Sequence, residues 1–292
     1  MKKSYDNINR LLQIIGHESG YGIDRYEPVH GGDINNAFCL YSGNKKLFLK
    51  LNNSNSYPLM FRKEANGLNK LKNHSFITIP EVISNGIAEE QQYLLLKWME
   101  RGNPRNDCME RFGADLAGMH QQQQSFFGFE EDNYIGSLQQ PNTKHDSWPS
   151  FYTSCRILPL VKRLFDHGLF SKKEIDNANS FCKKLKDLFP EESPSLLHGD
   201  LWGGNYMIGS DGYVIMYDPA VYYGHREMDI GMTELFGGFG QQFYDAYNAT
   251  NPLQQGWKNR LPLTQLYPLL VHAILFGGHY IHNARQILES YS

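Results

Sequence analysis

The stretch HGDLWGGN, residues 198–205, holds an aspartate and an asparagine five positions apart, Asp200 and Asn205. This is the spacing of a kinase-type catalytic loop, in which the aspartate accepts the proton of the acceptor hydroxyl and the asparagine oxygen binds a metal ion. Two apolar runs follow around the turn GSDG at 209–212, which predicts a β-hairpin. The second strand ends at another carboxylate, Asp218. Since Mg²⁺ prefers a few hard oxygen ligands together with phosphate oxygens, we predict Asp200 as the base and Asn205 and Asp218 as metal ligands.

Each part of this pattern has a simpler alternative. A His-Gly-Asp triplet alone usually marks a turn, and a loop aspartate most often caps a helix or turns the chain. The case for catalysis depends on the ordered set: an aspartate, an asparagine at plus five, a hairpin, and a second aspartate at the hairpin exit. Chance rarely supplies all four, so we interpret the segment as a phosphoryl-transfer site.

A lysine and a glutamate upstream are placed to serve a nucleotide. Lys50 follows the apolar run at 47–49, which would direct its ammonium group at phosphates, and Glu64 lies in the next predicted helix, where it could hold Lys50 by an ion pair. Taken singly, a solvated strand-end lysine and an exposed helix charge are the simpler interpretations. Their order relative to the catalytic loop favours a phosphate clamp.

Two further segments are candidates for nucleotide binding. The segment HGGDINNA contains Gly31 and Gly32, whose backbone N–H groups could approach phosphates closely, although a plain hairpin turn fits it nearly as well. The segment LLKWM contains Lys97 and Met99 and is the predicted hinge between two lobes, where backbone groups could contact adenine.

One more carboxylate, Asp229, lies downstream of the hairpin in the segment REMDI. It could support the catalytic loop by accepting hydrogen bonds from backbone N–H groups. A charge at the start of a helix is an equally good interpretation. The sequence leaves both open.

The chain divides into a β-rich part and a helical part. Short predicted strands and turns alternate up to about residue 100, and helical patterns then dominate, apart from the hairpin. We therefore predict an α+β protein with two lobes and a cleft, in which residues 1–97 form a small ATP-binding lobe and residues 98–292 a larger, mostly helical catalytic and substrate-binding lobe. No linker rich in Pro, Gly or Ser separates them, so the lobes are expected to act as one unit.

The expected strands are 38–41, 46–51 and 93–98, and the expected helices are 61–72, 108–120, 151–168, 172–189 and 262–289.

The overall composition is that of an ordinary globular protein. With 28 basic and 31 acidic residues among 292, the formal net charge is −3, which gives no electrostatic reason to expect nucleic acid or an anionic membrane as partner. The most apolar stretch, 266–276, is too short to span a bilayer, and the basic start is not followed by the apolar run of a signal peptide. Four scattered cysteines without a CxxC pair argue against a disulfide framework or zinc site and favour a cytoplasmic location.

Together these residues resemble the fructosamine kinase (ketosamine-3-kinase) family, which shares a protein-kinase-like fold with aminoglycoside phosphotransferases. The specific marks are HGDLWxGN at 198–205 and DPAVYYGHRExD at 218–229, with NYIG at 133–136 and FGGF at 236–239 as further family segments. The resemblance extends from about residue 31 to residue 283. A Trp directly after Asp-Leu, with the long second string, separates this family from choline and aminoglycoside kinases.

The resemblance implies a reaction as well as a fold. The γ-phosphate of ATP, with Mg²⁺, would pass to the 3-hydroxyl of a ketosamine, a sugar adduct on a free amine or on a lysine of a glycated protein. A 3-phosphate beside the C2 carbonyl can eliminate, and hydrolysis then frees the amine, so the kinase would start a deglycation. The roles implied are the base for Asp200, metal ligands for Asn205 and Asp218, the phosphate clamp for Lys50 and Glu64, and the sugar site for Trp202.

Three positions depart from the family pattern. Gly203 stands where Ser is common, which loosens the loop without removing a required group. Asp33 stands where many members carry Cys, which excludes thiol-based switching there, and its charge is expected to point away from the triphosphate. Lys97 stands where the hinge often has Glu, which leaves backbone contacts with adenine open.

Two other functions fit parts of the pattern. One is a kinase for another small alcohol, such as choline or an aminoglycoside, and Trp202 argues against it. The other is a catalytically silent nucleotide-binding protein that acts through partners, and the complete set of catalytic groups argues against that. The sequence does not distinguish ribulosamine, erythrulosamine and fructosamine substrates, or a free from a protein-bound amine, and it does not give the oligomeric state.

Overall fold

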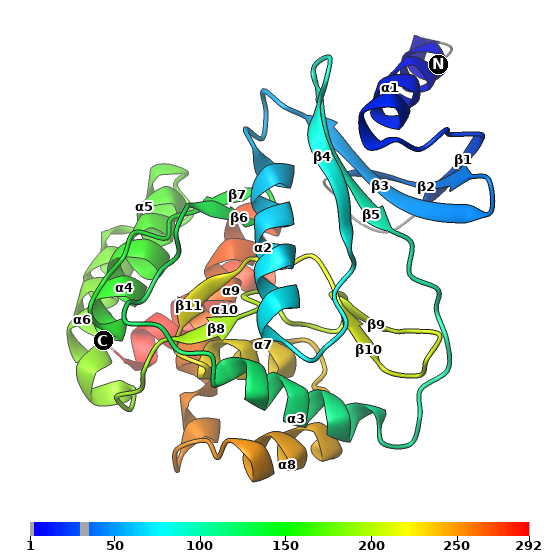
Figure 1. Ribbon diagram of the computed structural model, residues 1–292. Coiled ribbons are helices and arrows are strands. Elements are labelled where there is room, and N and C mark those ends of the chain that lie inside the picture. Colours follow the sequence, from blue (N-terminus) through cyan, green and yellow to red (C-terminus); the bar gives the residue numbers. More distant parts are fainter. Residues whose placement is uncertain (1–2, 30–34, 292) are drawn as a thin grey trace.

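The computed structural model describes residues 3–29 and 35–291, and for residues 3–7 it describes the backbone only. One part of the molecule is a five-stranded antiparallel sheet with helices α1 and α2, and the other part is built of helices and short two-stranded sheets (Figure 1). The elements run, in chain order, as α1 (Lys3–Ser19), β1 (Arg25–Val29), β2 (Asn36–Ser42), β3 (Lys45–Asn53), α2 (Met60–His74), β4 (Val82–Ala88), β5 (Gln91–Lys97), α3 (Cys108–His120), β6 (Asn133–Ile135), β7 (Leu138–Gln140), α4 (Trp148–Phe151), a π-helix (Tyr152–Ile157), α5 (Leu158–Asp166), α6 (Lys172–Leu188), β8 (Ser195–Leu197), β9 (Tyr206–Ile208), β10 (Val214–Met216), β11 (Tyr222–Gly224), α7 (Glu227–Leu235), α8 (Gln241–Thr250), a 3₁₀-helix (Trp257–Arg260), α9 (Leu261–Phe276) and α10 (His279–Ser290).

The large sheet has the strand order β1-β2-β3-β5-β4. Its β2–β3 hairpin confirms the predicted pair of strands, both of which are longer than expected. The strands pair from Asn36↔Leu51 to Ser42↔Lys45 around a two-residue turn, where Gly43 takes a positive φ of 58°. The boundary predicted at residue 97 falls at the end of β5.

The two faces of the sheet belong to different cores because successive side chains of a strand point to opposite faces. On β5, Leu95 packs in a core with Leu11 and Ile15 of α1. Its neighbours Leu94 and Leu96 pack with α2 in a second core. That second core continues without a break into the helical part, so α2 and one face of the sheet share it with the rest of the molecule, in agreement with lobes that act as one unit.

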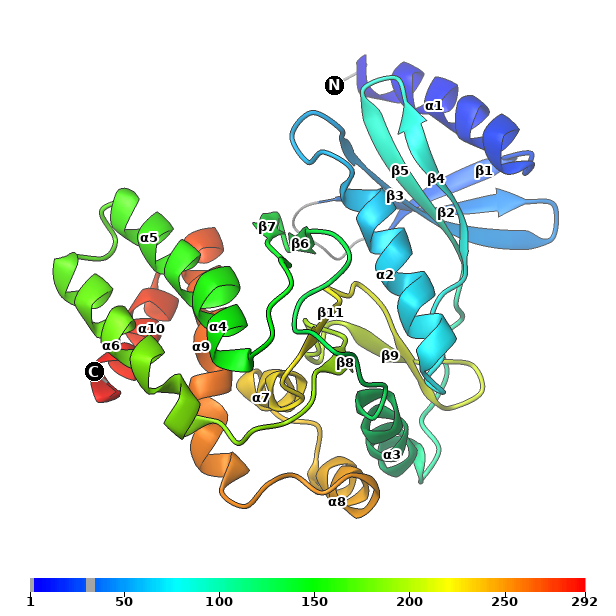
Figure 2. The same ribbon diagram turned by 60° about the vertical axis from the view of Figure 1, so that its left-hand side comes forward.

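The helical part surrounds two short hairpin-like sheets that carry the motifs of interest. Strands β9 and β10 pair as predicted on either side of the turn at 209–212, and β8 pairs with β11. Helix α3 packs along α8, and α9 packs beside α7 (Figure 2). The predicted α+β class is confirmed.

Several elements were not expected from the sequence. The first hundred residues were predicted to mix strands and turns, but α1 spans Lys3–Ser19. The single helical segment predicted at 262–289 is wrong, because Gly277 and Gly278 both take positive φ values and separate α9 from α10. Within residues 3–29 and 35–291, no helix is both long and apolar enough to cross a membrane.

Candidate active site

A pocket of about 250 Å³ lies between α2, the segment after β10, and α9. Its lining contains five of the residues predicted for the site: Lys50, Glu64, Asp200, Asn205 and Asp218. Trp202 lines it as well. A larger hollow of about 720 Å³ lies between α1 and the start of β1, and none of the predicted site residues lines it. The chemistry therefore concentrates in the smaller pocket.

The catalytic loop follows directly from β8. Gly199 takes a positive φ of 84°, and a Cβ there would lie 2.0 Å from the carbonyl oxygen of Ala220, so only glycine fits. The Ala220 amide donates to the His198 carbonyl at 2.9 Å, and the buried His198 ring reaches the Tyr217 carbonyl at 3.1 Å through Nε2. These contacts fasten the loop to the chain on both sides of Asp218.

Asp200 is held by the asparagine that follows it at plus five. Asn205 Nδ2 donates to the Asp200 carboxylate at 2.9 Å and to the Asp200 carbonyl at 2.8 Å. Burial raises the pKa of the Asp200 carboxyl group to about 7, the Asn205 hydrogen bond opposes this, and the charges of Asp218 and Asp229 add to it. A carboxylate with a pKa near neutrality is suited to accept a proton at physiological pH.

Lys50 lies inside β3 and is only 5% exposed, which excludes the solvated strand-end interpretation. Its Nζ is 2.7 Å from Glu64 and 2.5 Å from Asp218. Burial alone would lower the pKa of this ammonium group, but the two carboxylates outweigh it and the pKa is raised. The lysine is therefore a permanent positive charge at the junction of the sheet and the catalytic segment.

Asp218 takes a positive φ of 55°, which is uncommon for a residue other than glycine. Its side chain is 44% exposed, and it lines the same pocket as Asn205. Since Asn205 turns Nδ2 to Asp200, its Oδ1 is the atom that it can give to a cation. Among the described residues, no group of three or more His, Cys, Asp or Glu side chains could hold an ion alone. This donor set fits Mg²⁺, which takes few protein oxygens and completes its shell with phosphate and water.

Part of the pocket lining is aromatic. Trp202 is 38% exposed, and its ring lies over Gly204, where a Cβ would come within 2.3 Å of the indole. The ring meets Phe236 edge-on at a centroid distance of 5.6 Å, and Phe236 in turn lies 5.1 Å from the ring of His272. Trp202, His272 and Phe276 line the pocket, and Phe236 packs against Trp202 and His272 without lining it.

Asp229 supports the catalytic loop, one of the two roles considered for it. It is 1% exposed and accepts hydrogen bonds from the His198 amide at 2.7 Å and the Gly199 amide at 2.9 Å. Asp229 also lies in the first turn of α7, so the second interpretation, a charge at the start of a helix, holds as well.

The predicted adenine residues Lys97 and Met99 lie outside the lining of the pocket, and the predicted phosphate segment lies outside the described residues. The Lys97 amide already donates to the Glu81 carbonyl at 2.9 Å, so this N–H cannot contact adenine. Lys97 is itself exposed. Gly31 and Gly32, and Asp33 after them, lie outside the described residues.

The pocket also contains residues that the sequence did not single out as site residues. Lys63 lies next to Glu64 on α2, and its Nζ is 5.6 Å from the ring centre of Tyr134 on β6. His272 and Phe276 come from α9. Tyr134 lines the pocket and belongs to the segment NYIG, which the sequence had already marked as a family segment. Nothing in the local pattern of α9 indicated its part in a pocket.

Comparisons with known proteins agree with this geometry. The family model described as Fructosamine kinase matches residues 6–292. The chain is 38% identical over 266 residues to a protein of Enterococcus faecium named "Probable ketoamine kinase", covering 90% of this chain and 94% of that protein. A protein of Synechocystis sp. with the same name is 38% identical over 287 residues, covering 96% and 95%.

Solved structures give the same result. A crystal structure described as "putative fructosamine-3-kinase" from Thermobifida fusca has a TM-score of 0.87 at 32% identity, covering 97% of this chain and 98% of the other. A spectinomycin phosphotransferase, solved with ADP and spectinomycin, has a TM-score of 0.60 at 14% identity, covering 97% and 93%, and shows likeness of fold alone. The bilobal protein-kinase-like fold is confirmed.

Proposed function

The chain belongs to the fructosamine kinase family, and on this premise we propose that it transfers the γ-phosphate of ATP to the 3-hydroxyl group of a ketosamine. The family membership makes the chain an ATP-using phosphotransferase with a sugar-amine hydroxyl as acceptor. The observation that carries the finer proposal is the convergence of Lys50, Asp200, Asn205 and Asp218 on one pocket with the indole of Trp202.

Asp200 acts as the general base. It takes the proton of the acceptor hydroxyl as that oxygen forms a bond to the γ-phosphorus, while the bond from the γ-phosphorus to the bridging oxygen of ADP breaks. The raised pKa of Asp200 supports this role, since a base of this strength can accept the proton during the transfer and release it to solvent afterwards. Asn205, at 2.9 Å, orients the carboxylate.

Lys50 neutralises the nucleotide phosphates. In this structure its ammonium group is shared by Glu64 and Asp218, so an incoming triphosphate competes for it with two carboxylates. Asn205 and Asp218 are the residues that would hold Mg²⁺, and a bound Mg²⁺ would neutralise phosphate charge. If Asp218 bound such an ion, it would release Lys50, whose ammonium group would then contact the phosphates and Glu64.

Trp202 forms the sugar site. Its exposed indole offers an apolar face for the C–H groups of a sugar, two residues from the base. The acceptor could be a ribulosamine, an erythrulosamine or a fructosamine, on a free amine or on a protein lysine. The 3-phosphate would then be eliminated next to the C2 carbonyl, and hydrolysis would free the amine, which makes the reaction the first step of a deglycation.

The test is a panel of acceptors with wild type and Asp200→Asn. Wild type should consume ATP with ribulosyl-, erythrulosyl- or fructosyl-lysine in preference to choline or an aminoglycoside, and the product should carry phosphate at C3. Asp200→Asn should lower kcat by about 10²–10⁴-fold while ATP still raises its Tm. A preference for choline, or no ATP turnover with any ketosamine, would contradict the proposal.

The same variant also makes a prediction about stability. Since ionised Asp200 opposes folding above its raised pKa, Asp200→Asn should be at least as stable as wild type at pH 8.

A further inference from the structure

A column of buried polar side chains runs from helix α8 to the catalytic loop. Tyr247 is 0% exposed, and its hydroxyl oxygen lies 2.7 Å from Nδ1 of His120. His120 Nε2 lies 3.2 Å from Asp229 Oδ2, the same oxygen that accepts the His198 amide. The loop that carries Asp200 is thus joined to α8 by three consecutive hydrogen bonds.

The donors and acceptors of this column have a fixed order. A carboxylate only accepts hydrogen bonds, so a neutral His120 must present Nε2–H to Asp229. Its Nδ1 then has only a lone pair, and the hydrogen bond to Tyr247 forms only if the hydroxyl donates. Burial raises the pKa of Tyr247, which keeps its proton in place for this purpose.

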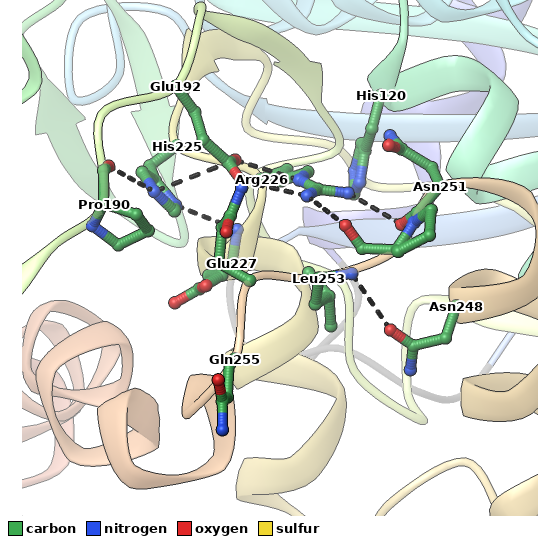
Figure 3. Close-up of polar contacts among 12 residues, drawn as sticks. His120, Pro190, Glu192, His225, Arg226, Glu227, Asn248, Asn251, Leu253 and Gln255 are labelled. Carbon is green, nitrogen blue, oxygen red and sulfur yellow. Dashed lines mark hydrogen bonds and ion pairs between the residues drawn. The ribbon is translucent and has the colours of Figure 1, made fainter.

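The column ends near a charged guanidinium, that of Arg226. This guanidinium lies between Glu192 and the Asn251 carbonyl (Figure 3). Nε and one terminal nitrogen each donate to the Glu192 carboxylate at 2.9 Å, and the other terminal nitrogen donates to the Asn251 carbonyl at 2.8 Å. Another bond reaches the Pro252 carbonyl. Arg226 also lies near Tyr247, where its charge works against the rise of the Tyr247 pKa. An arginine never accepts a hydrogen bond, so the Tyr247 hydroxyl cannot donate to Arg226 and its proton is left to point at His120.

We propose that Tyr247 is a positioning residue of the transfer reaction: its hydroxyl sets the tautomer and orientation of His120, so that His120 and Asp229 hold the amides of His198 and Gly199. This inference rests on the proposed function, because the loop it positions carries the proposed base. It assigns a part in turnover to a helix that contributes nothing to the lining of the pocket.

The kinetic test compares two tyrosines of α8. Tyr247→Phe removes the hydroxyl and keeps the ring, which packs edge-on against His120 at 5.6 Å. Tyr244→Phe is the matched control, since Tyr244 is also buried and its hydroxyl bonds Thr233 Oγ1 at 3.0 Å and the Phe239 amide at 3.3 Å, away from Asp229. Both variants should lose similar stability.

The two variants should differ in turnover. We expect Tyr247→Phe to lower kcat by about tenfold with an unchanged KM for ATP, and Tyr244→Phe to keep a kcat within about twofold of wild type. Equal kcat values for the two variants would overturn the proposal.

A spectroscopic measurement on the unaltered chain is independent of activity. With ¹⁵N-labelled histidine, and His120→Asn to assign its signals, the wild-type His120 ring should be neutral and carry its proton on Nε2. A proton on Nδ1, or on both nitrogens, would overturn the proposal, because Tyr247 would then be an acceptor and could not set the tautomer. An inactive wild type with His120 in the expected tautomer would instead contradict the proposed function alone.

Discussion

The two sides of the pocket are built in different ways. On the proposed nucleotide side, Lys50 lies between Glu64 and Asp218 at hydrogen-bond distance and is 5% exposed, so charges are fixed before any ligand enters. On the proposed acceptor side, Trp202 is 38% exposed and touches Phe236 only through ring edges. Phosphoryl transfer needs preorganised charge, whereas a sugar can be held by an apolar surface. Substitutions on the first side should therefore reduce turnover with every acceptor, and substitutions on the second should change the affinity for the acceptor.

On the proposed nucleotide side of the pocket, the largest effect is expected at the buried lysine. Lys50→Ala should lower kcat/KM for ATP by about 10²–10³-fold, because the phosphates lose their cation and two carboxylates are left facing each other. Lys46→Ala is the matched control on the same strand: its side chain is 41% exposed and pairs with Glu100 at 2.7 Å. That variant should stay within about twofold of wild type, as exposed ion pairs contribute little. Steady-state kinetics measure both, and similar losses in the two variants would show that fixed charge is not what the nucleotide side provides.

The pH dependence should follow the base on the charged side. Burial, helped by the charges of Asp218 and Asp229 and opposed by Asn205, raises the pKa of Asp200 to about 7. A base must be ionised to accept a proton, so kcat/KM for the acceptor should be constant above pH 7 and fall by about tenfold for each unit below it. Excess Mg²⁺ keeps the nucleotide in one charge state during the measurement. A flat profile between pH 5 and pH 8 would mean that Asp200 is not the titrating group.

The sequence predicted the charged side better than the aromatic side for a physical reason. Lys50, Asp200, Asn205 and Asp218 follow one another in an order that phosphoryl transfer requires, and the structure brings all four to one pocket. Within the catalytic loop the spacing alone determines much of the geometry, as the fit of Gly199 against the chain shows.

The aromatic side is assembled by tertiary packing. Phe236 follows α7, and His272 lies on α9, so their meeting with Trp202 depends on how three distant segments pack. The hinge stays a prediction: Lys97 is the last residue of β5, within the strand expected at 93–98, and its amide donates to the Glu81 carbonyl. His120 lies on a correctly predicted helix, yet its bond to Asp229 crosses 109 residues of sequence, and no local pattern indicates it.

The smallest effect is expected at Trp202, and it tests the separation of the two sides most directly. Trp202→Ala should raise KM for the acceptor by about tenfold, the equivalent of one good aromatic contact, and leave KM for ATP unchanged. Trp202→Phe should cost less, about threefold, because a smaller ring can still meet Phe236. Phe165→Ala serves as control, since Phe165 is 42% exposed on α5 and does not line the pocket. If Trp202→Ala changed KM for ATP as much as KM for the acceptor, the indole would belong to both sides, and the division of the pocket into a charged and an aromatic half would be wrong.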